Sequence, residues 1–162
     1  MQTKTNAMRV LEAKKIPYTA HYFSPEIHSA EGVAQAVGVP AERVFKTLVV
    51  LPGEGRPLLA IVPGSAELDL KKLAQATGEK KLRMATQREA ESLTGLLVGG
   101  ISALALLNKG FRVVVDASAS RHERILVSAG QRGINLELAP QDLVAITRAR
   151  LADIARPSDA AA

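Results

Sequence analysis

An apolar run interrupted by one turn constrains the fold of this chain most. Residues 44–51 read Val-Phe-Lys-Thr-Leu-Val-Val-Leu and residues 58–62 read Leu-Leu-Ala-Ile-Val. The intervening Pro-Gly-Glu-Gly-Arg-Pro contains the residue types that turns prefer. This pattern predicts a β-hairpin. Because side chains alternate across a strand, residues 44–51 are apolar on both faces, so we expect a central strand buried on both sides.

Lys46 is the exception within that strand. It shares a face with Val44 and Leu48, where an ammonium group is costly to bury. A lysine there must reach solvent, pair with a carboxylate, or line a pocket. The strand pattern alone leaves open the ordinary case, a lysine near a strand end whose ammonium extends to water.

The rest of the chain predicts an interspersed set of helices and strands. Helices are expected over 5–15, from Ser29 as a cap to Gly38, from Asp69 to Gly78, from Thr86 to Gly95, and from Pro140 onward. Further strands are expected over 18–23, 80–84, 112–116, 124–128 and 134–138. Without regular βαβ alternation, and with several antiparallel pairs, this order predicts an α+β fold with a mixed, curved, barrel-like sheet surrounded by helices. We expect one domain over residues 1–156 and a disordered tail over 157–162.

Composition narrows the classes of function. The chain has no cysteine, which excludes disulfides, thiolate zinc sites and a cysteine nucleophile. The three histidines lack metal-ligand spacing, so neither a metal nor a cofactor is expected. The net charge of +5 favours a polyanionic partner such as RNA, although many soluble proteins are this basic. Aromatic residues make up only 3%, so phosphate contacts and one small pocket would have to bind such a partner. We expect a cytoplasmic location, because no signal peptide or membrane span is evident.

Three further segments are candidates for ligand binding. Gly99-Gly100-Ile101-Ser102 allows close backbone approach and an anion-binding nest of N–H groups, although two glycines are also common in turns. In residues 128–133, Ser128 is a candidate donor to a ligand and Arg132 a candidate phosphate contact. The densest basic stretch is a candidate tRNA contact or simply a solvated surface, and it comprises Lys71, Lys72, Lys80, Lys81, Arg83 and Arg88.

The ordered set of these motifs resembles the YbaK family, free-standing relatives of the editing domain of bacterial prolyl-tRNA synthetases. The resemblance runs from Met8 to Ala155. It is carried by Phe45-Lys46-Thr47-Leu48-Val49-Val50, Asp69-Leu70-Lys71-Lys72, Leu97-Val98-Gly99-Gly100-Ile101-Ser102, Val127-Ser128-Ala129-Gly130-Gln131-Arg132-Gly133 and Glu137-Leu138-Ala139-Pro140-Gln141-Asp142-Leu143. Each motif alone is weak, whereas the ordered set is specific.

The resemblance implies a mixed barrel-like fold and deacylation of mischarged tRNA, specifically Cys-tRNA(Pro) and Cys-tRNA(Cys). It implies mischarged tRNA as partner, with prolyl-tRNA synthetase as a second candidate partner. Lys46 corresponds to the key lysine of the family, and the implied substrate-binding residues are Thr47, Gly99, Gly100, Ile101, Ser128, Phe23 and Asn135. The N–H groups of Gly99 and Gly100 are the expected donors to the substrate carbonyl.

Several positions depart from the family pattern. Ala103 replaces a frequent proline, Gln131 a lysine, Asn135 an aspartate, and Phe23 stands where a tyrosine is expected. These departures concern the surroundings of the site. Two rival functions stay open, a hydrolase of Ala-tRNA(Pro) and a non-catalytic module that binds tRNA or a synthetase.

Overall fold

The computed structural model describes residues 4–158 of the 162-residue chain. The helices are α1 (Asn6–Ala13), α2 (Ala30–Val37), α3 (Leu70–Thr77), α4 (Gln87–Thr94) and α5 (Pro140–Thr147), with short 3₁₀ turns η1 (Ala41–Arg43), η2 (Ala103–Leu106) and η3 (Ala117–Arg121). The strands are β1 (Thr19–Tyr22), β2 (Phe45–Pro52), β3 (Leu58–Pro63), β4 (Ala66–Leu68), β5 (Leu82–Met84), β6 (Arg112–Asp116), β7 (Ile125–Ser128), β8 (Ile134–Leu138), β9 (Arg150–Ala152) and β10 (Ala155–Pro157).

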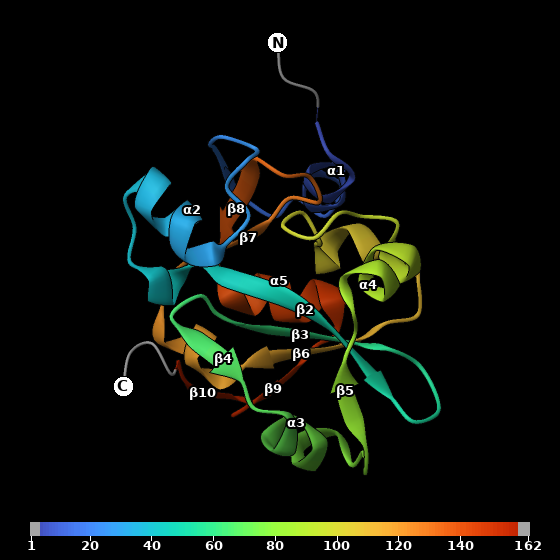
Figure 1. Ribbon diagram of the computed structural model, residues 1–162. Coiled ribbons are helices and arrows are strands. Elements are labelled where there is room, and N and C mark those ends of the chain that lie inside the picture. The colour runs from blue at the N-terminus through green and yellow to red at the C-terminus, as the bar shows by residue number, and fades with distance from the viewer. Residues whose placement is uncertain (1–3, 159–162) are drawn as a thin grey trace.

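The predicted hairpin forms the centre of the main sheet. β2 and β3 pair antiparallel with Lys46 opposite Val62 and Val50 opposite Leu58. The sheet order is β5-β2-β3-β6-β9, and β6 joins β3 in parallel, as β9 joins β6. All residues of β3 are buried. Figure 1 shows α3 below these strands and α1, α2 and the β7–β8 pair above them.

A three-stranded antiparallel sheet, β1-β8-β7, lies beside the start of β2. A single parallel bridge between Val44 and Leu126 connects the two sheets, and β10 pairs with β4 separately. The predicted mixed α+β fold is thus confirmed. Within residues 4–158 no sheet closes on itself, so the barrel-like detail is not confirmed.

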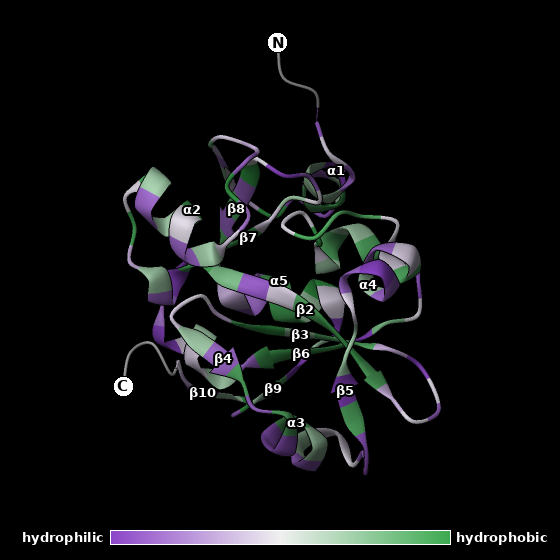
Figure 2. Cartoon of the chain, in the orientation of Figure 1, coloured by the Kyte–Doolittle hydropathy of each residue, from purple (hydrophilic) through white to green (hydrophobic). Residues whose placement is uncertain are grey.

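Both faces of the central strands are covered by apolar side chains. One cluster joins Phe45 and Val49 to Leu11 of α1 and Leu143 of α5. The opposite cluster joins Val50 of β2 and neighbouring strand residues to α3. Figure 2 shows β3 and the middle of β6 hydrophobic, whereas α3 is largely hydrophilic on its outer side. The expectation of a strand buried on both sides is therefore confirmed for β2 and holds even more strongly for β3.

The predicted helix caps are confirmed. Ser29 and Asp69 cap α2 and α3, and Thr86 forms a reciprocal capping box with Glu89 at the start of α4. These three helices each end at a left-handed glycine, which adopts this conformation without a steric penalty. No helix within residues 4–158 is long and apolar enough to cross a membrane.

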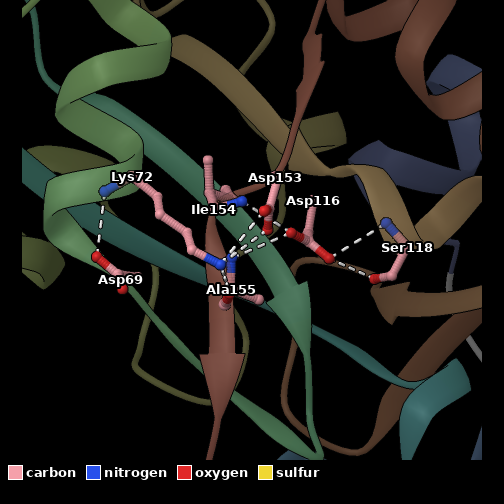
Figure 3. Close-up of polar contacts among 7 residues, drawn as sticks. All are labelled: Asp69, Lys72, Asp116, Ser118, Asp153, Ile154 and Ala155. Carbon is pink, nitrogen blue, oxygen red and sulfur yellow. Dashed lines mark hydrogen bonds and ion pairs between the residues drawn. The ribbon is translucent and has the colours of Figure 1, made fainter.

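The C-terminal segment is ordered further than expected. Asp116, at the end of β6, accepts hydrogen bonds from the N–H groups of Ile154 (2.9 Å) and Ala155 (3.1 Å) and also bonds Ser118. Figure 3 shows this carboxylate between Ser118 and residues 153–155, with Lys72 reaching the same segment from α3. Pro157 ends β10, so the expected disorder at this residue is wrong, because pairing with Ala66 fixes it. The rest of the expected tail, from 159 onward, lies outside the described residues.

Candidate active site

A pocket of about 210 Å³ opens where β2, the N-terminus of α2, the loop around Gly99 and the β7–β8 pair meet. Six residues expected at the site line it: Lys46, Thr47, Gly99, Ile101, Ser128 and Asn135. These residues come from positions up to 89 apart in the chain, and the packing of β2 against β7 brings them together.

Lys46 projects from β2 at the boundary between two apolar clusters. On the same face, Val44 belongs to the cluster beneath α2, and Leu48 packs on the cluster that includes α3 residues. Lys46 is half-buried, and its ammonium forms no hydrogen bond or ion pair within residues 4–158. Of the alternatives that the sequence left open, the structure thus supports a lysine that lines a pocket. Its charge is available to a bound anion or a developing oxyanion.

Both glycines of the Gly99-Gly100 loop lie where a side chain would be too close to neighbouring atoms. Gly99 has φ +93°, and a Cβ on it would lie 3.1 Å from the Cβ of His28. A Cβ on Gly100 would lie 2.9 Å from the backbone N of Arg132. The loop therefore fits only without side chains at either position.

Gly100 lies apart from the other expected site residues. It does not line the pocket, and its N–H already donates to the carbonyl oxygen of Leu97 at 2.8 Å. The structure therefore does not support the expectation that this N–H holds a substrate carbonyl. Of the two glycines, Gly99 is the one whose N–H donates to no group within the described part of the chain, so it can donate to a ligand.

Arg132 braces the pocket wall. Its Nε donates to the carbonyl oxygen of Val98 at 2.7 Å, while the N–H of Val98 donates to Glu91 Oε2 at 2.9 Å. The expected phosphate contact is not supported, because this guanidinium holds the loop that carries Gly99.

Ser128 and Asn135 are direct cross-strand neighbours on β7 and β8. Asn135 is only 6% exposed, yet its side-chain amide forms no hydrogen bond within residues 4–158. Its amide atoms are not among the fully buried unpaired atoms, so they remain accessible to water or a ligand. Since Asn135 lines the pocket, a bound ligand is the natural partner.

A charged network lies beside Asn135. Its cross-strand neighbour His21 donates to Glu137 Oε1 at 2.7 Å, and Arg43 donates to Glu137 Oε2 at 3.2 Å. Burial alone would raise the pKa of Glu137, but the hydrogen bond from His21 and the charge of Arg43 outweigh it and hold the pKa below its usual value. The network fixes β1 and η1 against β8.

The N-terminal end of α2 forms a wall that the sequence interpretation did not assign to the site. His28, Ser29 and Glu31 line the pocket there. The first N–H groups of a helix lack intrahelical acceptors and carry partial positive charge, which favours an anion. The predicted cap at Ser29 was the available signal, because it marks this end of the helix.

Phe23 lies outside the pocket. It packs in the cluster of Val33, Val44 and Leu126, and its N–H donates to the carbonyl oxygen of Gly133 at 3.0 Å. The structure therefore supports a packing contact for Phe23 and does not bring it to the Lys46 pocket. Across residues 4–158, no group of three or more His, Asp or Glu side chains is arranged to hold a metal ion.

Comparisons with known proteins agree with this geometry. Residues 24–146 match the aminoacyl-tRNA editing domain family. The chain is 43% identical over 155 residues, 94% of both chains, to an Enterococcus faecalis protein named a Cys-tRNA(Pro)/Cys-tRNA(Cys) deacylase, EbsC. It is 36% identical over 114 residues to proline–tRNA ligase 1 of Anaeromyxobacter dehalogenans, covering 19% of that longer protein.

Solved structures extend this likeness to the whole fold. The crystal structure of hypothetical protein APE2540 superposes with a TM-score of 0.86 at 25% identity, covering 93% of this chain and 99% of that one. A structure described as a trans-editing enzyme for prolyl tRNA synthetase superposes with a TM-score of 0.78 at 26% identity, covering 96% and 99%. The chain belongs to the aminoacyl-tRNA editing domain family.

Proposed function

We propose that this protein deacylates mischarged Cys-tRNA(Pro) and Cys-tRNA(Cys), freeing the tRNA in trans. The observation that carries this proposal is Lys46, a half-buried ammonium without a protein partner in a pocket of about 210 Å³. A pocket of this size suits a small aminoacyl group. The 43% identity to the protein named as such a deacylase supports this substrate. The substrate would place the activity in the cytoplasm.

The substrate supplies the nucleophile in the mechanism that we propose. The cysteinyl sulfur attacks its own ester carbonyl, a C–S bond forms, and the bond to the ribose oxygen breaks. The thiol proton passes to the departing ribose oxygen, and the cyclic thioester then reacts with water. Because the attack is intramolecular, proximity provides much of the acceleration. The chain has no cysteine, and this route needs no nucleophile from the protein.

In this mechanism the pocket residues bind the aminoacyl end of the tRNA and stabilise the charge that develops during the attack. Lys46 neutralises charge that develops near the ester or on the terminal phosphate, and the N–H of Gly99 donates to the carbonyl oxygen. Asn135 and Ser128 contact the cysteinyl group or the terminal adenosine. Thr47 and Ile101 contribute to the wall.

The nature of the side chain tests the nucleophile. The protein should release cysteine from Cys-tRNA(Pro) far faster than serine from Ser-tRNA(Pro), because a hydroxyl is the weaker nucleophile. A 2-aminobutyryl-tRNA is the matched control, since its side chain is similar in size but has no nucleophile. Rapid release of serine or 2-aminobutyrate would contradict the substrate-thiol route.

A hydrolase of Ala-tRNA(Pro) is the second candidate. The matches to proline–tRNA ligases favour it, because those proteins share this domain in about a fifth of their length. Alanine carries no nucleophile, so water would have to attack the ester. Release of alanine but not cysteine would establish this activity, and release of neither would point to a binding module or to a required complex with prolyl-tRNA synthetase.

A further inference from the structure

A second cavity of about 430 Å³ is lined by four arginines, Arg56, Arg112, Arg148 and Arg150. None of them lines the Lys46 pocket. The cavity lies toward the opposite end of the central hairpin. Leu58, which pairs with Arg112, is four residues along β3 from Val62, which pairs with Lys46. Four strand residues span roughly 13 Å.

The parallel strands explain why these arginines meet. β3, β6 and β9 run in the same direction, so their starting ends share one edge of the sheet. Arg112 is the first residue of β6, Arg150 is the first of β9, and Arg56 precedes β3 by two residues. Arg148 follows α5 and precedes β9 by two residues. Residues far apart in sequence therefore gather their charge at one place.

Two of the four guanidinium groups have clear structural partners. Arg112 donates to Glu79 Oε1 at 2.7 Å, and Arg150 donates to the carbonyl oxygen of Ala76 at the end of α3. The side chains of Arg56 and Arg148 form no hydrogen bond or ion pair within residues 4–158. The Nε of Arg112 is buried without an acceptor. Positive charge and unused donors therefore remain after the structural contacts are counted.

The backbone of Arg148 is a second observation. This residue is left-handed with φ +56°, at a helix end where α2, α3 and α4 each carry glycine. A side chain is strained in that conformation, so glycine would suit the fold better. Lys15, after α1, is the other left-handed non-glycine residue of residues 4–158, with φ +59°. What sets Arg148 apart is that its side chain lines the arginine cavity.

We propose that this arginine cavity binds backbone phosphates of RNA, as a contact separate from the Lys46 pocket. Guanidinium groups recognise phosphate through paired N–H donors. The cavity is a better candidate than the lysine-rich stretch noted in the sequence, because its four arginines line one hollow. In that stretch Lys72 pairs with Asp153 and Arg83 with Glu89. The choice of RNA as the ligand rests on the proposed function.

Binding of uncharged tRNA(Pro) at several salt concentrations tests the proposal. The double variant Arg56→Gln/Arg148→Gln should bind more weakly, and the slope of log Kd against log salt should fall by about 1 to 2. The matched control is Lys80→Gln/Lys81→Gln, which removes the same charge from exposed lysines and should leave the slope near that of the wild type. Equal changes in both doubles would overturn the proposal.

Arg148→Gly separates binding from folding. It should keep or raise the melting temperature, because glycine relieves the strained backbone, and it should still weaken tRNA binding. Wild-type affinity in a folded Arg148→Gly protein would overturn the proposal. Because the tRNA is uncharged, the result is independent of deacylation: a protein that binds through this cavity but releases no amino acid would contradict only the proposed function.

Discussion

A lysine on a strand with apolar side chains on both faces needs room for its ammonium. The pocket beside Lys46 provides that room, and Gly64, just after β3, lines it without a side chain. A Cβ on Gly64 would lie 2.6 Å from the Cβ of Ala30 and 3.0 Å from the carbonyl oxygen of Val44. The close approach brings the start of α2 to the pocket that Lys46 lines, so the positive end of the α2 dipole lies at the same pocket. Two sources of positive potential therefore act on one small space.

Gly99→Ala tests whether the geometry of this loop sets the activity of the site. The added Cβ meets His28 at 3.1 Å and the left-handed φ strains the backbone, so the loop must shift. We expect kcat/KM for Cys-tRNA(Pro) to fall at least about tenfold, with a stability loss of about 1–3 kcal/mol. Gly53→Ala is the control, because a Cβ there meets nothing within 4 Å. Wild-type kcat/KM in Gly99→Ala would show that this loop does not set the geometry of the site.

The sequence predicted those pocket residues that belong to a recognisable motif. Lys46, Gly99, Ser128 and Asn135 all line the pocket, as expected. Gly100 was not separable from Gly99, because sequence does not show which of two adjacent N–H groups is already bonded. The lining residues at the start of α2, and His28 just before its cap, could not be assigned because their role depends on how α2 packs against the sheet.

At the scale of elements, the helix ends are set by local chemistry. Glu89 accepts from the N–H of Thr86 at 2.9 Å and pairs with Arg83 at 2.7 Å. The hydrogen bond from Arg83, followed by that from Thr86, lowers the pKa of Glu89 from 4.5 to about 2. The charged form is thus favoured in the folded protein, and it caps α4 while holding β5.

This pKa shift predicts a pH dependence. Because the folded pKa lies below the unfolded one, the stabilisation is fully present above about pH 4.5 and is lost as the pH falls toward 2. The urea midpoint of the wild type should therefore approach that of Glu89→Gln across this window. Circular dichroism at pH 5, 4, 3 and 2 measures the difference. A constant difference between the two proteins down to pH 2 would contradict the role of this carboxylate.

Short strands show the limit of local patterns. β4, β9 and β10 have three residues each and were not predicted. Arg150 and Leu151 of β9 are both exposed, so the strand has no alternating apolar pattern to detect. Its partner is β6, more than thirty residues away, and that pairing is fixed by packing rather than by local propensity.

At the scale of the whole molecule, one buried carboxylate joins the end of the central sheet to the C-terminal segment. Asp116 is 4% exposed and accepts from the N–H groups of Ile154, which is fully buried, and Ala155. Asp116→Ala would leave the buried N–H of Ile154 without an acceptor. We expect the free energy of unfolding to fall by about 3 kcal/mol or more.

Asp153→Ala is the matched control for this prediction. The Asp153 side chain is 75% exposed and pairs with Lys72 at 3.2 Å. Exposed pairs contribute about 1 kcal/mol or less, so this change should have little effect. Urea unfolding of the two variants makes the comparison, and equal losses would refute the assignment of Asp116 as the main attachment of the C-terminal segment.

The sheet order could be predicted only in part. The central hairpin, the faces of β2 and the α+β class followed from alternation and turn residues. The parallel joining of β6 to β3, and the open arrangement of the sheets, could not, because long-range partners are not encoded in local periodicity. That arrangement places one positive pocket toward each end of the central hairpin.

Release of labelled cysteine from Cys-tRNA(Pro) by the wild type and by Lys46→Ala tests the central claim most directly. Lys80→Ala is the control, since it removes an exposed lysine that lines no pocket described here. We predict rapid release by the wild type and by Lys80→Ala, and a loss of at least about 100-fold in Lys46→Ala, the scale seen when a donor to a developing oxyanion is removed. Release by folded Lys46→Ala at the wild-type rate would contradict the account.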